Sequence, residues 1–145
     1  MAYQRIRLEE TGPVARLTLS WPEKRNALSL QMMEEVTHGL KALAGNPDVR
    51  AVILGAAGTA FSAGHFLTEM VDKDLNQQRL VFDTCIEMME TVQNISQPVI
   101  AEVPGTAYAA GCQLVATCDL AVASEGARFA TPGVKIGLFC TTPMV

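Results

Sequence analysis

Hydrophobic and polar positions alternate along this chain with two different periods. In residues 14–20 every second side chain is apolar, and this period of two predicts a strand with one buried face. Residues 49–55 form a short, nearly continuous apolar run, which is typical of a strand buried on both faces. Similar runs at 98–103 and 119–124 predict two further strands.

Apolar side chains at a helical spacing separate these runs. A first helix is expected over 29–44, where Ser29 can cap its start. A second is expected over 79–95 and a short third one over 109–118. Because strands and helices alternate along the chain, the sequence predicts one α/β domain, residues 1–145, with a largely parallel sheet.

Composition and charge narrow the range of partners. The formal net charge is −4 and no basic cluster occurs, which argues against nucleic acid as a partner. No apolar run reaches the roughly 18 residues that span a bilayer, so we expect no association with a membrane. Residues 1–10 are charged and lack the apolar segment of a secretory signal. The cysteines match no metal-binding pattern, and we interpret them as reduced packing residues of a cytoplasmic protein; they are Cys85, Cys112, Cys118 and Cys140.

Two turns between a strand and a helix consist mainly of small residues. One reads AFSAGHFLTEM, residues 60–70, and the other reads GTAYAAGCQL, residues 105–114. Each presents backbone N–H groups with little side-chain bulk, where the helix dipole adds partial positive charge. Two such N–H groups that converge would bind a carbonyl oxygen and stabilise it as negative charge develops. Tight packing is the alternative explanation for small residues at these turns.

Several segments follow one another along the chain in a familiar order. They read PEKRNAL, FSAGHFLTEM and PVIAEVPGTAYAAGCQLVATCDLAVASEGARFATPGVKIGL. Together they closely resemble the enoyl-CoA hydratase/isomerase (crotonase) family, and AAGCQL with FATPGVKIGLFCTTP resembles one subgroup of it. The resemblance implies a crotonase-like spiral of ββα units and a CoA thioester of fatty acid metabolism as substrate. It also implies no metal or other cofactor, and a homo-oligomer, either a trimer or a hexamer.

The resemblance assigns roles to the two turns. The family forms an oxyanion hole from two backbone N–H groups, which correspond here to those of His65 and Ala110, beside Gly64 and Gly111. Ala110 stands where the family usually has the second glycine of a Gly-Gly-Gly run, and its N–H is retained. The family uses only the backbone of the residue at position 65, so the His65 side chain is not expected to be the base.

Other positions correspond to residues that bind CoA in the family. For Lys24 and Arg25, which would meet the CoA phosphates, a solvated surface pair is the alternative. Phe66 replaces the family's usual Asp, so the local turn chemistry is expected to differ. The complete set of these positions is Lys24, Arg25, Ala27, Ala63, Phe66 and Leu67.

The carboxylates that the family uses for hydration are missing. Hydration needs one group that activates water and another that delivers a proton. At the positions of the family's two glutamates, this sequence has Gln113, an amide that exchanges no proton near neutral pH, and Gly133. Glu69 and Glu102 lie nearby in sequence, but a helix-surface role and a strand-end role suit them at least as well.

Two functions therefore stay open. The first is an enzyme of the hydratase/isomerase (lyase) type that stabilises a thioester enolate, although both replacements argue against ordinary hydratase activity. The second is a catalytically impaired homologue that binds CoA esters or acts as a scaffolding subunit, and a thioester hydrolase is a third reading. Since the family continues beyond position 145, we expect a fold that is incomplete at its C-terminus. Its apolar surface would then be covered by other chains, or the sequence is a truncated form of a longer natural product.

Overall fold

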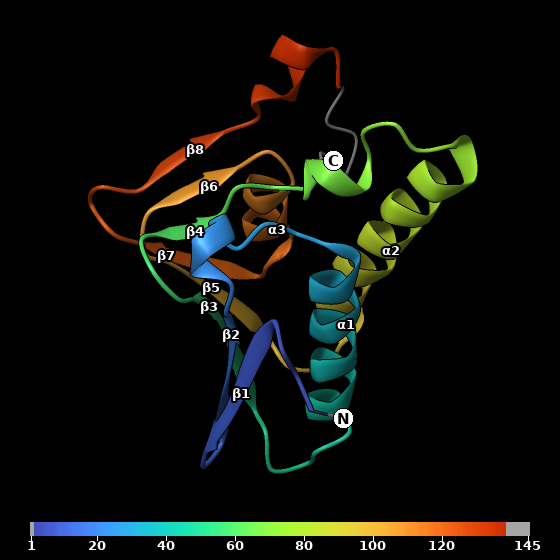
Figure 1. The fold of residues 1–145 in the computed structure, drawn as a ribbon. Coiled ribbons are helices and arrows are strands. Elements are labelled where there is room, and N and C mark those ends of the chain that lie inside the picture. The colour runs from blue at the N-terminus through green and yellow to red at the C-terminus, as the bar shows by residue number, and fades with distance from the viewer. Residues whose placement is uncertain (1, 139–145) are drawn as a thin grey trace.

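Two sheets organise the fold (Figure 1). In the computed structural model, which describes residues 2–138, a five-stranded sheet has the order β1-β2-β3-β5-β7 and a three-stranded sheet the order β4-β6-β8. The strands are β1 (Ile6–Thr11), β2 (Val14–Leu19), β3 (Ala51–Ala56), β4 (Ala60–Ser62), β5 (Val99–Val103), β6 (Thr106–Tyr108), β7 (Leu120–Ala123) and β8 (Arg128–Ala130). The helices are α1 (Leu30–Ala44), α2 (Leu75–Asn94) and α3 (Ala110–Thr117), with 3-10 helices η1 (Pro22–Lys24), η2 (Leu67–Glu69) and η3 (Pro132–Ile136).

The chain repeats one path three times. Strands β3, β5 and β7 enter the large sheet, the strand that follows each of them enters the small sheet, and a helical segment closes each turn. Because every turn runs in the same direction, these strands are parallel within each sheet. Only the hairpin β1–β2 is antiparallel in the described residues. The spiral of ββα units is thereby confirmed.

The short strands were not predicted. Strands β4, β6 and β8 have three residues each, which is too short to display a period of two. The N-terminal strand β1 was also missed. Helix α2 begins at Leu75, four residues earlier than expected, because Asp74 and Gln77 form a capping box that starts it.

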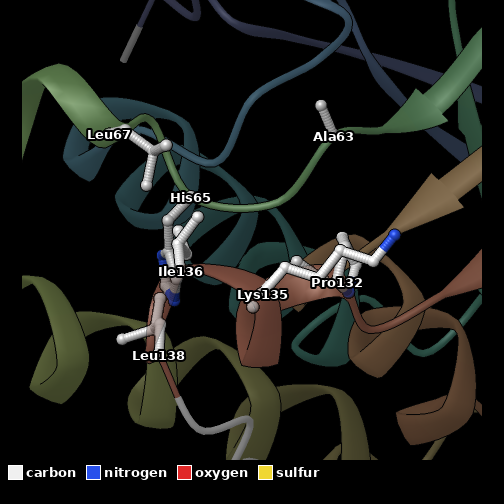
Figure 2. Close-up of a pocket in the computed structure, with 9 residues that line it drawn as sticks. Ala63, His65, Leu67, Pro132, Lys135, Ile136 and Leu138 are labelled. Carbon is white, nitrogen blue, oxygen red and sulfur yellow. The ribbon is translucent and has the colours of Figure 1, made fainter.

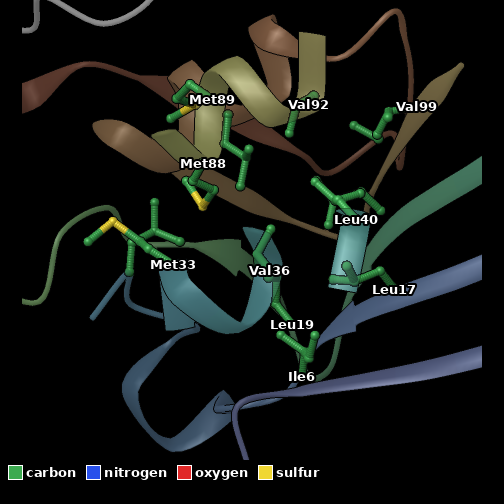
Figure 3. Packing of buried hydrophobic residues seen from close by; sticks show 14 of the residues in the cluster. Ile6, Leu17, Leu19, Met33, Val36, Leu40, Met88, Met89, Val92 and Val99 are labelled. Atoms are coloured by element: carbon green, nitrogen blue, oxygen red, sulfur yellow. The ribbon is translucent and has the colours of Figure 1, made fainter. Parts of the chain in front are cut away.

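The hydrophobic core lies between the large sheet and the helices α1 and α2 (Figure 3). The inner positions of β2, Leu17 and Leu19 among them, are fully buried, as the alternating pattern predicts. Helix α1 packs on this face, since a Cβ added at Gly39 would lie 3.2 Å from Leu17 Cδ1. Ser29 caps α1 by accepting a hydrogen bond from the N–H of Met32 at 3.1 Å, as expected.

The opposite face of the large sheet is partly open. Strand β3 was expected to be buried on both faces, but only one is: Val52 and Leu54 are buried, whereas Ile53 is half-buried. On the outer face, Arg16 of β2 and Glu102 of β5 form an ion pair of 2.5 Å. This ion pair passes over β3 at Gly55, which has no side chain. A Cβ at this position would lie 2.9 Å from the Arg16 guanidinium, so a larger residue would leave too little room for the ion pair.

Two side chains fix the N-terminal part of the domain. The buried carboxylate of Glu35 accepts hydrogen bonds from the backbone N–H groups of residues 4–6 and so ties the start of β1 to α1. The fully buried amide of Asn26 accepts from the N–H of Trp21 and donates to the carbonyls of Ala57 and Ala60, each at 2.8 Å. Asn26 thereby joins the loop after β2 to the loop that precedes β4.

The last strands leave large apolar side chains exposed. All residues of β7 and β8 are exposed, and both strands lie at sheet edges in the described residues. The exposed apolar side chains in this region are Leu120, Val122, Phe129, Val134 and Ile136. None of the helices in residues 2–138 is long and apolar enough to cross a membrane.

Candidate functional site

A pocket of about 300 Å³ lies between the His65 turn and the segment of η3. Figure 2 shows Ala63, His65 and Leu67 on one side, facing side chains of the 132–138 segment on the other. The lining residues are Ala63, His65, Leu67, Ala109, Pro132, Gly133, Lys135, Ile136 and Leu138. The pocket therefore joins both small-residue turns and the position of one missing family glutamate.

The direction of the His65 amide can be read from its own peptide bond. The carbonyl of Gly64, in the same planar peptide, accepts a hydrogen bond of 2.8 Å from the N–H of Leu28. In a trans peptide the N–H points opposite to the C=O, so the His65 N–H is directed away from Leu28. The neighbouring amides are occupied: that of Gly64 by Ser62 Oγ, and that of Phe66 by the carbonyl of Leu28. The His65 N–H has no acceptor among the described residues.

The Ala110 amide is held in the same way. The carbonyl of Ala109, in the Ala109–Ala110 peptide, accepts from the N–H of Gln113 at 3.1 Å, so the Ala110 N–H points out of the helix start. No side chain caps this end of α3. The N–H of Ala109 is used by the carbonyl of Ala130, whereas the Ala110 N–H has no acceptor among residues 2–138. This helix start is as bare as the sequence predicts.

The two turns touch each other through glycines. A Cβ added at Gly64, where φ is +91°, would lie 2.8 Å from the Cβ of Ala109 and 3.1 Å from the nitrogen of Ala110. A Cβ added at Gly111 would lie 2.6 Å from the carbonyl oxygen of Ser62. Any side chain at either position would push the turns apart. Tight packing, the alternative explanation for these small residues, thus holds for Gly64 and Gly111 and is what brings the two open amides near each other.

Ala109 carries backbone strain. Its φ is +50° and its ψ is −125°, a conformation that glycine adopts readily and residues with a Cβ adopt at a cost. The residue stands at the junction of β6 and α3, and it lines the pocket. Strain of this kind persists where the surrounding structure fixes the backbone.

The His65 side chain is half-buried and lines the pocket. Its ring meets that of Phe82 edge-on, with 5.5 Å between centroids. Its Nδ1 is buried and has no hydrogen-bond partner among the described residues. Burial lowers the pKa of His65 below its ordinary value, because the charged ring would lose its hydration. The neutral imidazole is therefore favoured.

The pocket contains no carboxylate in the part of the chain that the structure describes. Gly133 lies in the wall, and Gln113 is buried in α3 with an unpartnered Nε2. Glu102 is engaged on the outer face of the sheet by its ion pair. Glu69 accepts a hydrogen bond of 2.8 Å from the N–H of Leu30 at the start of α1. Glu102 thus lies near the end of β5, as foreseen, whereas the contact of Glu69 with the start of α1 was not foreseen.

The remaining predicted residues lie around the pocket, outside its wall. Lys24 and Arg25 are exposed in and beside η1, and neither forms an ion pair with another described residue. The carbonyl of Arg25 accepts from the N–H of the lining residue Ala63, which places η1 next to the pocket. Ala27 is buried behind the loop, and Phe66 packs edge-on against another ring, that of Trp21.

Sequence reasoning missed part of the pocket wall. Lys135, Ile136 and Leu138 contribute side chains to it, although the segment that contains them had been noted only for residue 133. The order of polar and apolar residues in this segment does not indicate a pocket wall. These residues line the pocket only because η3 folds back over the His65 turn.

The cysteines behave as packing residues where they are described. Cys85 is buried, and the thiol of Cys118 donates to the carbonyl of Leu114. Burial and the nearby Asp119 raise the pKa of Cys118 to about 12. Cys140 lies outside the described residues. Within residues 2–138, no group of three or more His, Cys, Asp or Glu side chains is placed to hold a metal ion.

Comparison with known sequences decides the family. The family model described as enoyl-CoA hydratase/isomerase matches residues 9–144. The chain belongs to this family. The resemblance to one subgroup of the family is also confirmed. Curated proteins named enoyl-CoA hydratase domain-containing protein 3 match over most of the chain.

Two vertebrate proteins of that subgroup illustrate the match. The Danio rerio protein is 50% identical over 138 residues, which is 94% of this chain and 48% of the relative. The Homo sapiens protein is 47% identical over 133 residues, 91% of this chain and 44% of the relative. A protein of Rhizobium meliloti (strain 1021) named probable enoyl-CoA hydratase is 35% identical, covering 95% of this chain and 53% of its own length. The chain thus spans about half the length of these relatives.

Solved structures show the same fold. The crystal structure of human enoyl Coenzyme A hydratase domain-containing protein 3 superposes with a TM-score of 0.93 at 42% identity, covering 97% of this chain and 56% of that one. An enoyl-CoA hydratase from Mycobacterium smegmatis gives a TM-score of 0.93 at 44% identity, covering 97% and 55%. The crotonase-like fold class is therefore established for this chain.

The names of the vertebrate relatives correct one expectation. Both are called mitochondrial. This contradicts the cytoplasmic location expected from the cysteines. Reduced thiols exclude an oxidising compartment, but they do not distinguish one reducing compartment from another, so the expectation was wrong.

Proposed function

We propose that the chain binds an acyl-CoA thioester and stabilises its enolate with the backbone N–H groups of His65 and Ala110. The supporting observation is the pair of amides that find no acceptor within residues 2–138, on two turns that touch through Gly64 and Gly111. A thioester carbonyl between them would accept two hydrogen bonds, and these strengthen as the oxygen gains charge in the transition state. The apolar walls of the adjoining pocket suit an acyl chain.

The CoA moiety would lie toward η1. Lys24 and Arg25 are exposed cations without ion-pair partners in the described residues, next to the lining residue Ala63. Phosphate groups of CoA would supply the missing counter-charges. Because both ligands share these phosphates, the double variant Lys24→Ala and Arg25→Ala should weaken the binding of free CoA and of acyl-CoA by the same factor. If the two residues are only a solvated surface pair, the double variant should leave both affinities unchanged.

A ligand-side experiment tests the carbonyl contact without altering the protein. Butyryl-CoA and S-butyl-CoA differ only in the thioester oxygen. Two neutral hydrogen bonds contribute about 1 kcal/mol each, so butyryl-CoA should bind about thirtyfold more tightly. The single tryptophan, Trp21, contacts Phe66 in the His65 turn and gives a fluorescence readout, with calorimetry as a check. Equal affinities for the two ligands would contradict the proposal.

A variant isolates the second donor. Ala110→Pro deletes one N–H at the first helical position, where proline is otherwise tolerated, and Ala110→Gly keeps that N–H as the matched control. Loss of one such donor costs about 2.7–4 kcal/mol of transition-state stabilisation. Turnover of crotonyl-CoA, followed by absorbance, should therefore fall at least about a hundredfold in the proline variant and change little in the glycine variant.

A second candidate function is binding without turnover. It is favoured by Gln113 and Gly133, and by a pocket wall without carboxylates in the described residues. A preference for butyryl-CoA combined with undetectable hydration of crotonyl-CoA would identify such an impaired, ligand-binding homologue. Measurable hydration or double-bond isomerisation would identify an enzyme of the lyase or isomerase type.

We also propose that the chain associates with further copies of itself. Exposed Leu120, Val122 and Phe129 on the edge strands, with Val134 and Ile136 of η3, present apolar surface that association would cover. Light scattering over a range of concentrations tests this point, and a monomer at every concentration would contradict it. This proposal is independent of the thioester site.

A further inference from the structure

The carboxylate of Glu69 lies outside the pocket wall and contacts the start of α1, while Glu69 itself belongs to the helical turn that follows His65. Glu69 ends the short helix η2, which directly follows the His65 turn. Its Oε2 accepts a hydrogen bond of 2.8 Å from the backbone N–H of Leu30, the first residue of α1 and 39 positions away in sequence. The positive end of the α1 dipole favours a negative charge there. Glu69 thus clamps η2 onto the start of α1.

The same two segments are also joined on the other side of His65. The N–H of Leu28 donates to the carbonyl of Gly64 at 2.8 Å, and the N–H of Phe66 donates to the carbonyl of Leu28 at 3.1 Å. These bonds set the plane of the Gly64–His65 peptide. Ahead of His65, the N–H of Ala63 also donates to the carbonyl of Arg25 at 3.0 Å. None of these bonds holds a residue of η2, so the peptide could tilt if η2 moved relative to α1.

Two anchor points are needed to fix a direction. Leu28 is one, and the bond between Glu69 and Leu30 is the other, two residues further along the same segment. We propose that Glu69 is a positioning residue that aims the His65 N–H into the pocket by holding η2 on the first turn of α1. This inference rests on the proposed function, since it concerns the donor that would bind the thioester oxygen.

The test measures the carbonyl preference, defined as the Kd for S-butyl-CoA divided by the Kd for butyryl-CoA, by calorimetry on the full chain. In the wild-type chain two hydrogen bonds predict a preference of about thirtyfold. Glu69→Ala should reduce it to about sixfold, because one of the two bonds is lost. Glu69→Gln retains an oxygen that can accept from Leu30 and should restore most of the preference.

Ser29→Ala is the matched control. It also removes a side-chain cap from α1, so it should lower the melting temperature in the same way, yet the Ser29 side chain forms no hydrogen bond with η2 in residues 2–138. Its carbonyl preference should equal that of the wild type. A purely structural role for Glu69 would make Glu69→Ala and Ser29→Ala alike in both melting temperature and preference.

The outcomes are distinct. A full preference in Glu69→Ala overturns the positioning role and leaves the thioester site intact. The absence of any preference in the wild-type chain overturns the thioester site itself and, with it, the role of Glu69. If Glu69→Ala does not fold, Glu69→Asp replaces it: the carboxylate is one methylene too short for Leu30, so the preference should fall, and an unchanged preference overturns the inference.

Discussion

Ala109→Gly should stabilise the protein, although replacing Ala by Gly usually has the opposite effect. The wild-type residue has φ +50° and ψ −125°, which costs a residue with a Cβ about 1–3 kcal/mol. Glycine has no such cost in the folded state. It loses about 0.5–1 kcal/mol more backbone entropy on folding than alanine does. The partly buried Ala109 methyl contributes less than the roughly 0.8 kcal/mol of one fully buried methylene.

These contributions leave a net gain in the free energy of unfolding of about 1 kcal/mol. With an unfolding entropy of about 2.1 cal/mol/K per residue, the 145-residue chain should melt about 3 °C higher. Urea unfolding followed by Trp21 fluorescence gives the same quantity as a shift of the midpoint at an unchanged slope. An unchanged slope matters because it shows that the substitution acts on stability and leaves the surface exposed on unfolding as it was.

Ala116→Gly is the control for this substitution. Ala116 lies in α3, the helix that Ala109 precedes; it is exposed and has no positive φ. There the exchange should destabilise by about 1 kcal/mol, as glycine does in a helix interior. Two destabilised variants of similar size would refute the reasoning, since they would mean that the Ala109 backbone is not strained in the folded chain.

Three further predictions concern stability, pH and reactivity. Asn26→Ala removes the three hydrogen bonds of the buried amide and should cost about 3 kcal/mol or more in urea unfolding, whereas Asn46→Ala, which removes exposed hydrogen bonds, should cost less than about 1 kcal/mol. Burial lowers the pKa of His65, so below about pH 6.5 the unfolded chain binds more protons than the folded chain does. The free energy of unfolding should therefore be highest, with respect to this group, above about pH 6.5. It should decrease as the pH drops toward the pKa of the folded state. His65→Gln should flatten that slope. With its pKa raised to about 12, Cys118 should resist alkylation in the native protein at pH 8 and react in urea, as peptide mass spectrometry would show.

The longer elements could be predicted because their signals are local. Helix α1 begins after Ser29 as expected, since the cap and the apolar stripe occur within one stretch of sequence. The alternation in β2 likewise identifies its buried face. Strands β4, β6 and β8 carry no such signal, and their pairing depends on contacts between successive turns of the spiral. The open outer face of β3 was unpredictable for the same reason, because the strand's own composition does not report its neighbours.

The site was predictable only where small residues mark a close approach. Gly64 and Gly111 stand out in the sequence, and the structure gives the reason, namely contacts that leave no room for a Cβ. The pocket wall from Lys135 to Leu138 and the contact of Glu69 with the start of α1 join segments far apart in the chain. Nothing in local composition indicates which distant amide a carboxylate will reach.

The glycine contact has a consequence for redesign. A new reactive side chain cannot be introduced at Gly64 or Gly111, because there is no space for even a methyl group at either position. The opposite wall is different: Gly133 and the exposed Ile136 border the same cavity from a segment with fewer neighbours. A catalytic carboxylate grafted onto this chain would have to enter from that wall, leaving the amide-bearing turns as a fixed half of the site.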